Sequence, residues 1–313
     1  KIMKILVINA GSSSLKYQVI DTAENQVITK GLCERIGIDG RHTNKTNGGK
    51  FVEEVEMKNH SQALKVVIDC LLSDKVPAIN SLEDIEAVGH RVLHAGEVYN
   101  DSVLITDEVM VELEKLIPLG PLHQPANIAG INACNELLPG VPQVAVFDTA
   151  FHQTMPDYAY RYAVPRAWYT ELGVRRYGFH GTSHLYVSKV AAKLLGKPAN
   201  ECNLITLHIG SGASATAIRN GVSVDTSLGM TPLAGLTMGT RPGDLDPGVV
   251  LYVMQRLGLT PDQMQKHLNK DSGLLGLTEC YADRRDVESN KDTNDACRLA
   301  IDMEAHNVKK YIG

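Results

Sequence analysis

The sequence has no long apolar run, no closely spaced cysteines and no run of basic residues. None of its apolar stretches approaches the ~20 residues that a membrane-spanning helix needs, and Ile5–Ile8 is too short for a signal peptide. The six cysteines form no CxxC pair, so zinc knuckles and thioredoxin-like motifs have no support. Scattered cysteines are typical of reduced, mostly buried thiols. We therefore expect a soluble cytoplasmic protein without a membrane partner.

The charge balance also argues against a nucleic-acid partner. The 313 residues include 31 Lys and Arg against 36 Asp and Glu, which gives a formal net charge of -5. Nucleic-acid binding usually requires a basic patch, and none is visible in the sequence. With 43% apolar and 21% charged residues, the chain can bury a sizeable core. Its length suggests two domains.

The chain opens with a pattern of three strands. The run Ile5–Asn9 is short, apolar and rich in β-branched residues, as expected for a buried strand. A Gly/Ser turn follows at Ala10–Ser14, and residues 15–19 then alternate between apolar and polar side chains. A third strand is expected over Gln26–Thr29. The polar stretch Arg41–Lys50 is the best candidate for a loose loop.

About two hundred residues later the same pattern recurs. The apolar run Asn203–Ile209 ends in Gly210-Ser211-Gly212, and further strands are expected over Ala213–Ile218 and Val222–Asp225. Asn220-Gly221 between them is a strong hairpin signal. Duplication of a whole lobe is the simplest explanation for the two matching three-strand patterns. Two unrelated hairpins would give the same pattern.

The remaining segments predict an alternating α/β fold. Helices are expected over Ala63–Leu72, over Pro125–Leu138 and from Thr182 or Ser183, as N-cap, to Leu195. A buried strand is expected over Gln143–Phe147, directly before Asp148. The segment Glu86–Leu93 carries apolar pairs on either side of Gly89-His90-Arg91.

The two Gly/Ser turns are suited to phosphate binding. Small residues leave backbone N–H groups and hydroxyls accessible to phosphate oxygens. Neither turn is a Walker loop, because GxxxxGK[ST] is absent and a strand follows each turn. Two such turns could hold one polyphosphate between two lobes.

Two arginines and one aspartate are candidates for an anion site. Arg91 and Arg241 follow glycines, and a guanidinium can bind a carboxylate or phosphoryl group through two hydrogen bonds. Structural ion pairs with acids such as Glu97 or Asp244 would explain these arginines equally well. Asp148 follows a predicted strand, where α/β sheets usually bind ligands. It could instead cap the next element.

Histidines provide a further candidate. His180 lies between Phe179 and Gly181 at an expected helix start, where it could donate to an anion. The spacing of His180 and His184 would also suit a metal, but HExxH and a third ligand are missing. His184 is expected to be structural. For His208 a structural and a ligand-binding role are equally plausible.

Several motifs together resemble the acetate kinase family. They are Asn9-Ala-Gly-Ser-Ser-Ser14-Leu-Lys16, Gly89-His-Arg91, Pro121-Leu-His, Val146-Phe-Asp148-Thr-Ala-Phe-His-Gln, Arg175-Arg-Tyr-Gly-Phe-His-Gly-Thr-Ser-His184 and Met238-Gly-Thr-Arg241. The resemblance runs from residue 4 to the C-terminus. It implies an α/β, actin/hexokinase-like fold of two duplicated ribonuclease H-like lobes with a cleft between them. Residues 1–150 would form the acyl-substrate and phosphate lobe, and residues 151–313 the nucleotide lobe.

The resemblance also implies a reaction and roles for individual residues. The reaction is reversible, in-line phosphoryl transfer from ATP to acetate with Mg²⁺, or Mn²⁺, giving acetyl phosphate and ADP for acetyl-CoA biosynthesis, in a homodimer. Arg91 and Arg241 would hold the carboxylate and the migrating phosphoryl group, His180 would stabilise the transition state, and Asp148 would be the essential acid, orienting magnesium-bound water. The other implied site residues are Asn9 at the metal, Ser12, Ser14 and Lys16 at the phosphates, His208, Ile209, Gly210, Ser211 and Gly212 in the second phosphate turn, Asp283, Arg284 and Arg285 at the nucleotide, and Leu93, Leu122, Phe179 and Pro232 around the methyl group.

The chain departs from the family pattern in a few places. Leu93 stands where the family usually has Val, and Ser211 where it usually has Asn, which changes the phosphate turn. Family members are usually longer, and the second lobe repeats the first without a counterpart of Gln143–Phe147. We therefore expect the second lobe to be incomplete, with the adenosine segment and a late magnesium-binding Glu beyond Gly313.

Two alternatives to an acetate kinase remain open at this point. A propionate or butyrate kinase would share the same motifs. An actin-like nucleotide-dependent binding protein without turnover would share the fold, although it would not need two arginines that bind a carboxylate.

Overall fold

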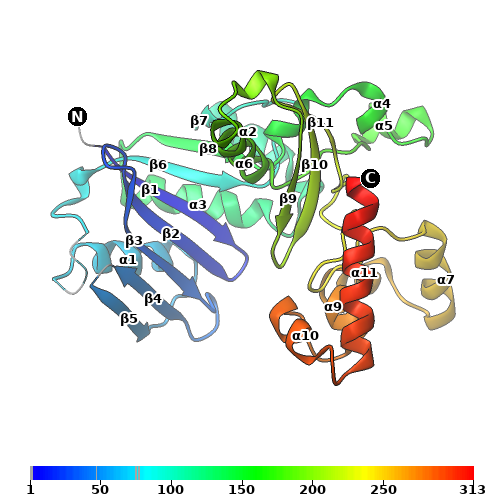
Figure 1. The fold of residues 1–313 in the computed structure, drawn as a ribbon. Helices are drawn as coiled ribbons and strands as arrows, with labels where there is room; N and C mark the ends of the chain where they lie inside the picture. Colours follow the sequence, from blue (N-terminus) through cyan, green and yellow to red (C-terminus); the bar gives the residue numbers. More distant parts are fainter. Residues whose placement is uncertain (1–2, 47, 75, 77) are drawn as a thin grey trace. The chain divides into compact units, whose positions relative to one another are not determined.

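The computed structural model describes residues 3–46, 48–74, 76 and 78–313. The chain forms two compact units, Lys1–Ala150 and Phe151–Gly313. Both units combine helices with a β-sheet (Figure 1).

The first unit is built on an eight-stranded sheet in the order β5-β4-β3-β2-β1-β6-β8-β7. The strands are β1 (Lys4–Gly11), β2 (Ser14–Asp21), β3 (Gln26–Glu34), β4 (Arg41–Thr46), β5 (Gly49–Glu54), β6 (Ile85–Val92), β7 (Val103–Leu104) and β8 (Gln143–Phe147). Strands β1 to β5 form an antiparallel meander, whereas β6 pairs in parallel with β1 and with β8. The carboxyl ends of β1, β6 and β8 therefore lie along one edge of the sheet.

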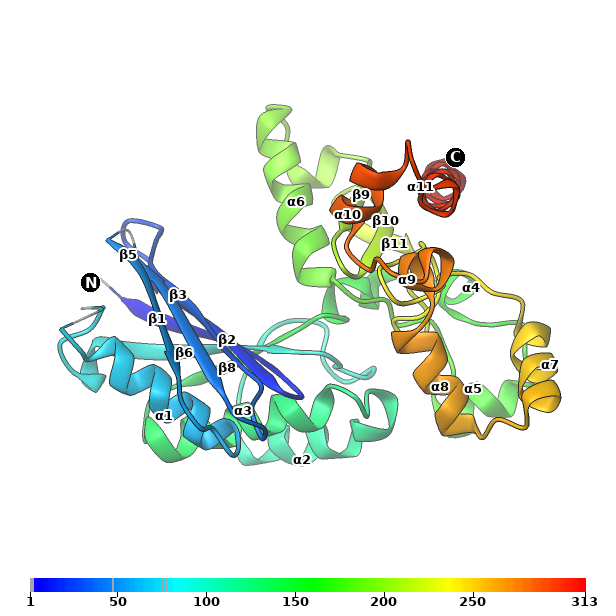
Figure 2. The same cartoon turned by 90° about the horizontal axis from the view of Figure 1, so that it is seen from below.

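Three helices cover one face of this sheet (Figure 2). They are α1 (His60–Leu71), α2 (Asp107–Lys115) and α3 (Gln124–Leu137). The alternating residues Leu6, Ile8 and Ala10 of β1 are buried on this side. Gly130 of α3 allows close packing, because a Cβ atom there would lie 2.9 Å from the Cβ of Ala10. The helices thereby fix the position of β1 and of the turn that follows it.

The expected loose loop over Arg41–Lys50 is wrong. Residues 41–46 form β4, and β5 follows at Gly49. The inward side chains of β4 are polar but fully buried: His42 and Asn44 are each 0% exposed. Both make hydrogen bonds to Tyr17, at 2.9 and 2.6 Å. A strand whose buried face is polar lacks the apolar alternation by which strands are recognised in a sequence.

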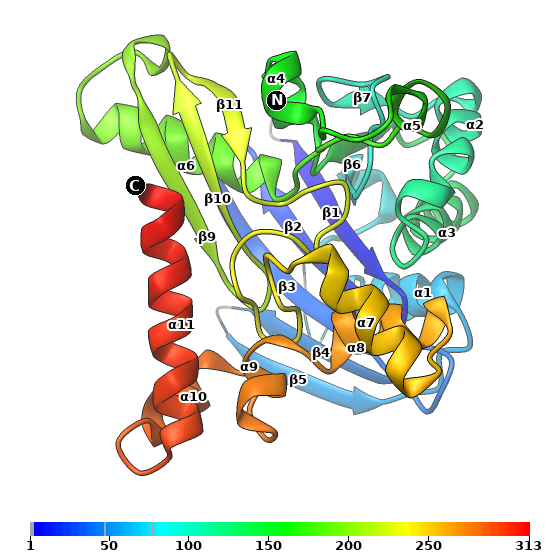
Figure 3. The same ribbon diagram turned by 90° about the vertical axis from the view of Figure 1, so that its right-hand side faces the viewer.

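The second unit contains a three-stranded sheet in the order β11-β10-β9 (Figure 3). Its strands are β9 (Leu204–Ile209), β10 (Ala213–Arg219) and β11 (Val222–Thr226), all antiparallel to their neighbours. Helix α6 (Gly181–Leu194) packs against β9. This meander repeats the order of β1, β2 and β3, each time with a short Gly/Ser turn after the first strand. The predicted α/β fold with two lobes that open alike is thus confirmed.

The rest of the second unit is mainly helical. Its other helices are α4 (Asp157–Tyr160), α5 (Arg166–Leu172), α7 (Pro247–Leu257), α8 (Pro261–Lys270), α9 (Gly273–Thr278), α10 (Arg284–Asn290) and α11 (Asp295–Ile312). Short 3-10 turns occur in the first unit at η1 (Leu82–Asp84) and η2 (Ile117–Leu119), at the boundary of the units at η3 (Ala150–Thr154), and in the second unit at η4 (Ala199–Glu201). Helices α9, α10 and α11 share a small core of Leu274, Val287, Cys297 and Ala300. None of the helices in the described part of the chain has the length and apolar character needed to cross a membrane.

Candidate active site

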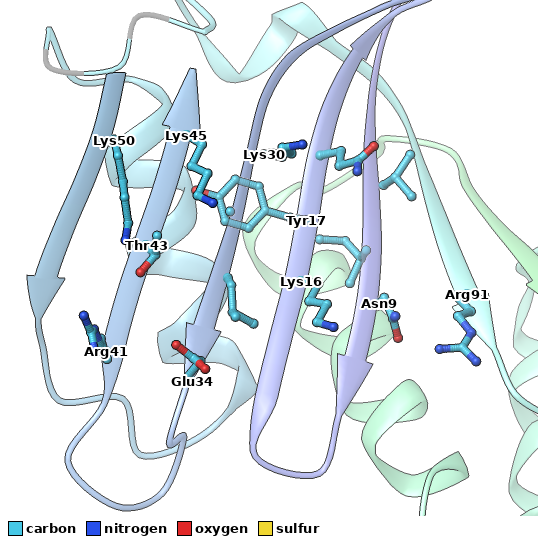
Figure 4. A pocket seen from close by; sticks show the side chains of 15 residues that line it. Asn9, Lys16, Tyr17, Lys30, Glu34, Arg41, Thr43, Lys45, Lys50 and Arg91 are labelled. Atoms are coloured by element: carbon cyan, nitrogen blue, oxygen red, sulfur yellow. The ribbon is translucent and has the colours of Figure 1, made fainter. Parts of the chain in front are cut away.

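The first group of predicted residues lies where β1 and β2 meet their connecting turn. Asn9 and Lys16 are partners in the β1–β2 ladder, and Ser12 and Ser14 belong to the turn or its edge. Asn9, Ser14, Lys16 and Arg91 line a cavity of ≈ 200 Å³. Figure 4 shows Asn9, Lys16 and Arg91 on neighbouring strands, at one end of a larger hollow that crosses the sheet. The structure therefore brings four of the predicted polar residues of this unit together around one cavity, whose lining does not include Ser12.

Arg91 and Asp148 form an ion pair with two hydrogen bonds. Arg91 Nε donates to Asp148 Oδ1 at 2.9 Å, and Arg91 Nη2 donates to Asp148 Oδ2 at 2.6 Å. The two residues meet because Arg91 lies near the carboxyl end of β6 and Asp148 directly follows β8, its parallel neighbour. This hydrogen bonding raises the pKa of Arg91. The guanidinium thus stays charged and is held in a fixed orientation.

Exposure differs strongly within this pair. The Asp148 side chain is 3% exposed, whereas that of Arg91 is 46% exposed. A buried carboxylate needs such a partner, while Arg91 keeps its Nη1 group for other acceptors. The sequence left open a structural ion pair between Arg91 and a nearby acid, and such a pair is seen, with Asp148 as the acid. Both carboxylate oxygens of Asp148 accept from this arginine.

The two leucines predicted around the methyl group of the substrate differ in position. Leu93 is 7% exposed and lines the ≈ 200 Å³ cavity beside Arg91. Leu122 is 48% exposed and is not among the residues that line this cavity. His123 and Asn127 do line it, although sequence reasoning did not select them. Asn127 Nδ2 donates to the Ala10 carbonyl at 2.8 Å, and its Oδ1 accepts from the Leu93 N–H at 2.9 Å.

The second group of predicted residues lies in the second unit, around His180. His180 is the N-cap of α6 and has a left-handed backbone with φ of 58°. The predicted caps Thr182 and Ser183 are therefore wrong, because the helix already begins at Gly181. Left-handed backbone is costly for a residue with a Cβ atom and is often found at functional sites.

The ring of His180 is fixed on two sides. It stacks on His208 with ring centroids 4.0 Å apart and an interplanar angle of 23°. Its Nδ1 atom lies 2.8 Å from Ser214 Oγ. His184, one turn along α6, is buried and lies within hydrogen-bond distance of Thr206 and Ser214, as expected for a structural histidine. Nε2 of His180 is therefore the ring nitrogen directed away from this support.

The Nε2 atom of His180 and the guanidinium of Arg241 meet at the turn 210–212. A Cβ atom on Gly212 would lie 3.3 Å from His180 Nε2 and 2.8 Å from Arg241 Nη2. The backbone of the turn can approach both groups only because residue 212 is glycine. One histidine and one arginine thus converge on a glycine-rich turn, which is an arrangement suited to anions.

Arg241 is positioned by its own loop. Its Nη1 donates to the carbonyl of Pro232 at 2.7 Å, and burial lowers its pKa. Asp244, offered as a structural partner, instead accepts hydrogen bonds from Lys310 and Tyr311. The structure thus places Arg241 beside Pro232, which was predicted in the methyl pocket. Phe179, predicted there as well, is 1% exposed.

Residues 238–241, called here the Arg241 loop, are joined to neighbouring segments on both sides by backbone hydrogen bonds. The Gly239 N–H donates to the Ser211 carbonyl of the glycine-rich turn at 3.1 Å. On the other side, the N–H groups of Leu274 and Leu275 donate to the carbonyls of Met238 and Gly239, both at 2.9 Å. The turn 210–212, the Arg241 loop and the start of α9 are therefore linked to one another by main-chain hydrogen bonds.

The predicted nucleotide residues Asp283, Arg284 and Arg285 lie at the start of α10. Asp283 caps this helix and forms an ion pair with Arg285, which lowers its pKa to about 2. Arg284 binds Glu304 and Glu288. The carbonyl of the preceding Ala282 would be 2.7 Å from a Cβ atom on Gly239. The segment thus adjoins the Arg241 loop, but in this structure its charged groups bind one another.

The donors in the first unit fit a magnesium ion. Mg²⁺ prefers oxygen ligands, keeps several waters and usually takes only one or two protein groups besides phosphates. Asn9 lines the cavity beside Arg91, and Arg91 binds the carboxylate of Asp148, so an amide oxygen and a carboxylate lie close to this cavity. Among the described residues no group of three or more His, Cys, Asp and Glu forms a metal site. A protein-only cage is not required for this ion.

Comparison with known proteins assigns the chain to a family. A family model described as the acetokinase family matches residues 4–313. The chain belongs to the acetokinase family. It is 53% identical over 313 residues to the acetate kinase of Clostridium novyi (strain NT), covering 99% of this chain and 78% of that protein.

Solved structures agree with this assignment. The acetate kinase of Porphyromonas gingivalis matches with a TM-score of 0.95 and 46% identity, covering 99% of this chain and 79% of that chain. A propionate kinase from Francisella tularensis subsp. tularensis SCHU S4 matches with a TM-score of 0.94 and 41% identity, with the same coverage. The fold of this acetokinase is thus that of acyl kinases of solved structure.

Proposed function

We propose that this acetokinase transfers a phosphoryl group reversibly between ATP and acetate, giving ADP and acetyl phosphate. The observation that carries the proposal is the convergence of His180 Nε2 and Arg241 Nη2 on the turn at Gly212. Phosphoryl transfer needs little covalent help from the protein. It needs alignment and hydrogen-bond donors around the equatorial oxygens of the migrating group.

The reaction joins two anions, so the protein must offset their repulsion. A carboxylate oxygen of acetate attacks the γ-phosphorus and forms a new P–O bond, while the bond to the bridging oxygen of ADP breaks. We assign the guanidinium of Arg241 and Nε2–H of His180 to the phosphoryl oxygens, as donors at positions where negative charge develops. Acetate is ionised near neutral pH, so no general base is needed to activate it.

Arg91 is assigned to the carboxylate of acetate. The ion pair with Asp148 fixes its guanidinium before the substrate arrives, which reduces the entropy cost of binding. Leu93, buried at the edge of the same cavity, would contact the methyl group. In this assignment Asp148 acts partly by orienting Arg91.

Magnesium would be held through Asn9 and through water bound by Asp148. Each carboxylate oxygen of Asp148 accepts a hydrogen bond from Arg91 and retains capacity to accept from water. When bound, the ion supplies positive charge to the phosphate oxygens. Ser12, Ser14 and Lys16 would contact the phosphates from the β1–β2 turn. In the second unit, His208 to Gly212 and the segment 283–285 would contact the nucleotide.

A propionate kinase is the second candidate, because a structure of that name matches with a TM-score of 0.94. Propionate differs from acetate by one methylene, which a binding pocket discriminates by only about 1–3 kcal/mol. The two activities therefore differ in degree.

The deciding experiment measures acyl phosphate formation. Purified protein is incubated with ATP, Mg²⁺ and acetate, propionate or butyrate, and the acyl phosphate is trapped as its hydroxamate. We expect the highest kcat/KM for acetate. No acyl phosphate from any acid would overturn the proposal and favour an actin-like binding protein without turnover. A control without Mg²⁺ tests the metal requirement separately.

We further propose that the protein acts in the cytoplasm as a homodimer and supplies acetyl phosphate for acetyl-CoA synthesis. Light scattering coupled to gel filtration measures the assembly directly. A monomeric mass at micromolar concentration would contradict the dimer.

A further inference from the structure

A chain of polar side chains runs from His180 into the interior of the second unit. Ser214 Oγ lies 2.8 Å from His180 Nδ1 and 2.8 Å from His184 Nε2. His184 Nδ1 lies 2.7 Å from Thr206 Oγ1. Ser214 is 0% exposed, His184 1% and Thr206 5%. No role in the reaction has so far been given to the three residues behind His180.

The protonation of His184 limits how this chain can be arranged. Burial, with smaller contributions from His152, His180 and His208, lowers the pKa of His184 to about 3. His184 is therefore neutral near pH 7 and carries one ring N–H. A serine hydroxyl has one proton, so Ser214 can donate to only one of its two histidine neighbours.

Two directions of hydrogen bonding satisfy all four groups. In the first, Thr206 donates to His184 Nδ1, His184 Nε2–H donates to Ser214, and Ser214 donates to His180 Nδ1. In the second, every donor and acceptor is reversed, and His180 Nδ1–H donates to Ser214. Only the first direction leaves neutral His180 with its proton on Nε2, the atom that faces Gly212 and Arg241.

We propose that Ser214 is a positioning residue for His180, and that Thr206 and His184 set the direction in which it donates. This inference rests on the proposed function of His180 as a donor to the migrating phosphoryl group. The chain holds the neutral imidazole in the Nε2–H tautomer and fixes the plane of the ring. A donor that is already oriented loses no free energy to reorganisation as charge develops in the transition state.

A fixed tautomer matters because a neutral imidazole has only one N–H to donate. The Nε2 side of the ring is the side that the reaction would use, since Arg241 Nη2 approaches the same glycine as His180 Nε2. The ring of His208, stacked on His180 at 4.0 Å, helps to hold the plane in which that N–H points.

The test replaces the hydroxyl of Ser214. Ser214→Ala removes the donor to His180 Nδ1 while leaving nearly the same volume. We expect kcat to fall about 10- to 100-fold, the range known for lost hydrogen-bond partners of metal-binding histidines, with little change in the KM of acetate or ATP. Ser214→Cys, whose thiol is a weak donor, should regain part of the lost rate.

Two further variants separate positioning from packing. Thr206→Val breaks the chain at its far end without touching His180, and should lower kcat in the same direction by a smaller factor. Thr216→Val is the matched control: Thr216 is buried in the same strand as Ser214, and its Oγ1 lies 2.9 Å from that of Thr226. We expect this variant to retain kcat.

A spectroscopic readout tests the tautomer without reference to activity. Nitrogen-15 shifts of the histidine rings distinguish Nε2–H from Nδ1–H, and the His180→Asn variant assigns the signals. We expect the Nε2–H form in the wild type and a mixture in Ser214→Ala. Unchanged His180 shifts and unchanged kcat in Ser214→Ala would overturn the inference, as would an Nδ1–H tautomer in the wild type. Lack of acyl phosphate formation by the wild type would overturn the proposed function instead, and the shifts would still decide whether Ser214 sets the tautomer.

Discussion

The guanidinium of Arg241 and the backbone of Gly212 lie so close that no Cβ atom fits between them. A Cβ atom on Gly212 would come within 2.8 Å of Arg241 Nη2 and 3.3 Å of His180 Nε2. Both contacts involve the ends of side chains, which can move without disturbing the main chain.

Gly212→Ala should therefore reduce activity far more than stability. The added methyl group displaces Arg241 and the His180 ring from the turn, and a misplacement of about 1 Å at a reacting group can cost about 100-fold in rate. We expect kcat to fall by about that factor while the Tm stays near that of the wild type. Gly48→Ala serves as control, because its Cβ atom would meet only Thr46 Oγ1 at 3.6 Å. An active Gly212→Ala enzyme would contradict the proposed position of the phosphoryl group.

The two arginines should differ in their effect on stability although both are needed for activity. Arginines that stabilise a phosphoryl-transfer transition state contribute at least about 10³-fold, so Arg91→Ala and Arg241→Ala should both be nearly inactive. Lysine at either position should restore little, because an ammonium cannot make the two-point contact. The exposed Arg256→Ala is the matched control. Activity close to that of the wild type in either alanine variant would return that arginine to a structural role.

Only Arg91→Ala leaves a buried carboxylate without its partner. Asp148 is 2% exposed, and uncompensated buried charge is costly. We expect a lower urea midpoint for Arg91→Ala than for Arg241→Ala. The double variant Arg91→Ala with Asp148→Asn should recover part of this loss. Additive effects of the two changes in a double-mutant cycle would show that the pair contributes nothing to stability.

Leu93 should set the preference among short carboxylic acids. It lines the ≈ 200 Å³ cavity with Arg91, and its Cδ2 atom would lie 2.6 Å from a Cβ atom on Gly120. Leu93→Ala should raise kcat/KM for propionate relative to acetate by about 10- to 200-fold, the range expected for one methylene. Leu122→Ala, at an exposed residue outside this cavity, should change the ratio much less. A higher kcat/KM for butyrate than for acetate in the wild type would refute this assignment of the pocket.

The stability of the first unit should decrease between pH 6.5 and pH 4. Burial lowers the pKa of His90 to about 4, whereas the unfolded chain has a pKa near 6.5. Between these values the unfolded state binds more protons, so the free energy of unfolding rises with pH and falls on acidification. Neutral His90 is bound to Gln143 across β6 and β8, with Nε2 2.7 Å from Oε1.

Replacing His90 should flatten this pH dependence. We expect His90→Gln to be less stable than the wild type at pH 7 but to lose less stability on going to pH 5, measured as the change in urea midpoint. The exposed His306→Gln provides a control with the same number of histidines. An unchanged pH slope in His90→Gln would show that other groups dominate the acid loss.

The sequence was sufficient for elements whose burial follows apolar periodicity. Strand β1 is recognised because Leu6, Ile8 and Ala10 alternate toward the helices, and the observed β8 has the predicted bounds Gln143–Phe147. The β4–β5 hairpin was missed because its stability depends on contacts that are distant in sequence. His42 and Asn44 are buried against Tyr17, twenty-five and twenty-seven residues earlier.

In the candidate site, too, the sequence predicts individual residues but not the contacts between them. Arg91 and Asp148 could each be selected from local sequence, but their direct contact depends on β6 and β8 being neighbours in the sheet. Ser214 gave no signal, because a buried serine in a strand has no distinctive pattern. Its importance follows from the atoms on either side of it, His180 Nδ1 and His184 Nε2.

The backbone hydrogen bonds on both sides of residues 238–241 have a consequence for hydrogen exchange in this part of the molecule. The amides of Gly239, Leu274 and Leu275 all hydrogen-bond to main-chain carbonyls of the turn or of the arginine loop. Exchange of such amides with solvent requires their hydrogen bonds to break. Hydrogen bonds made by the same short segment of main chain tend to break in one cooperative opening event. These three amides should therefore exchange with deuterium at similar rates, and a ligand bound at the glycine-rich turn should slow all three, including those at the start of α9.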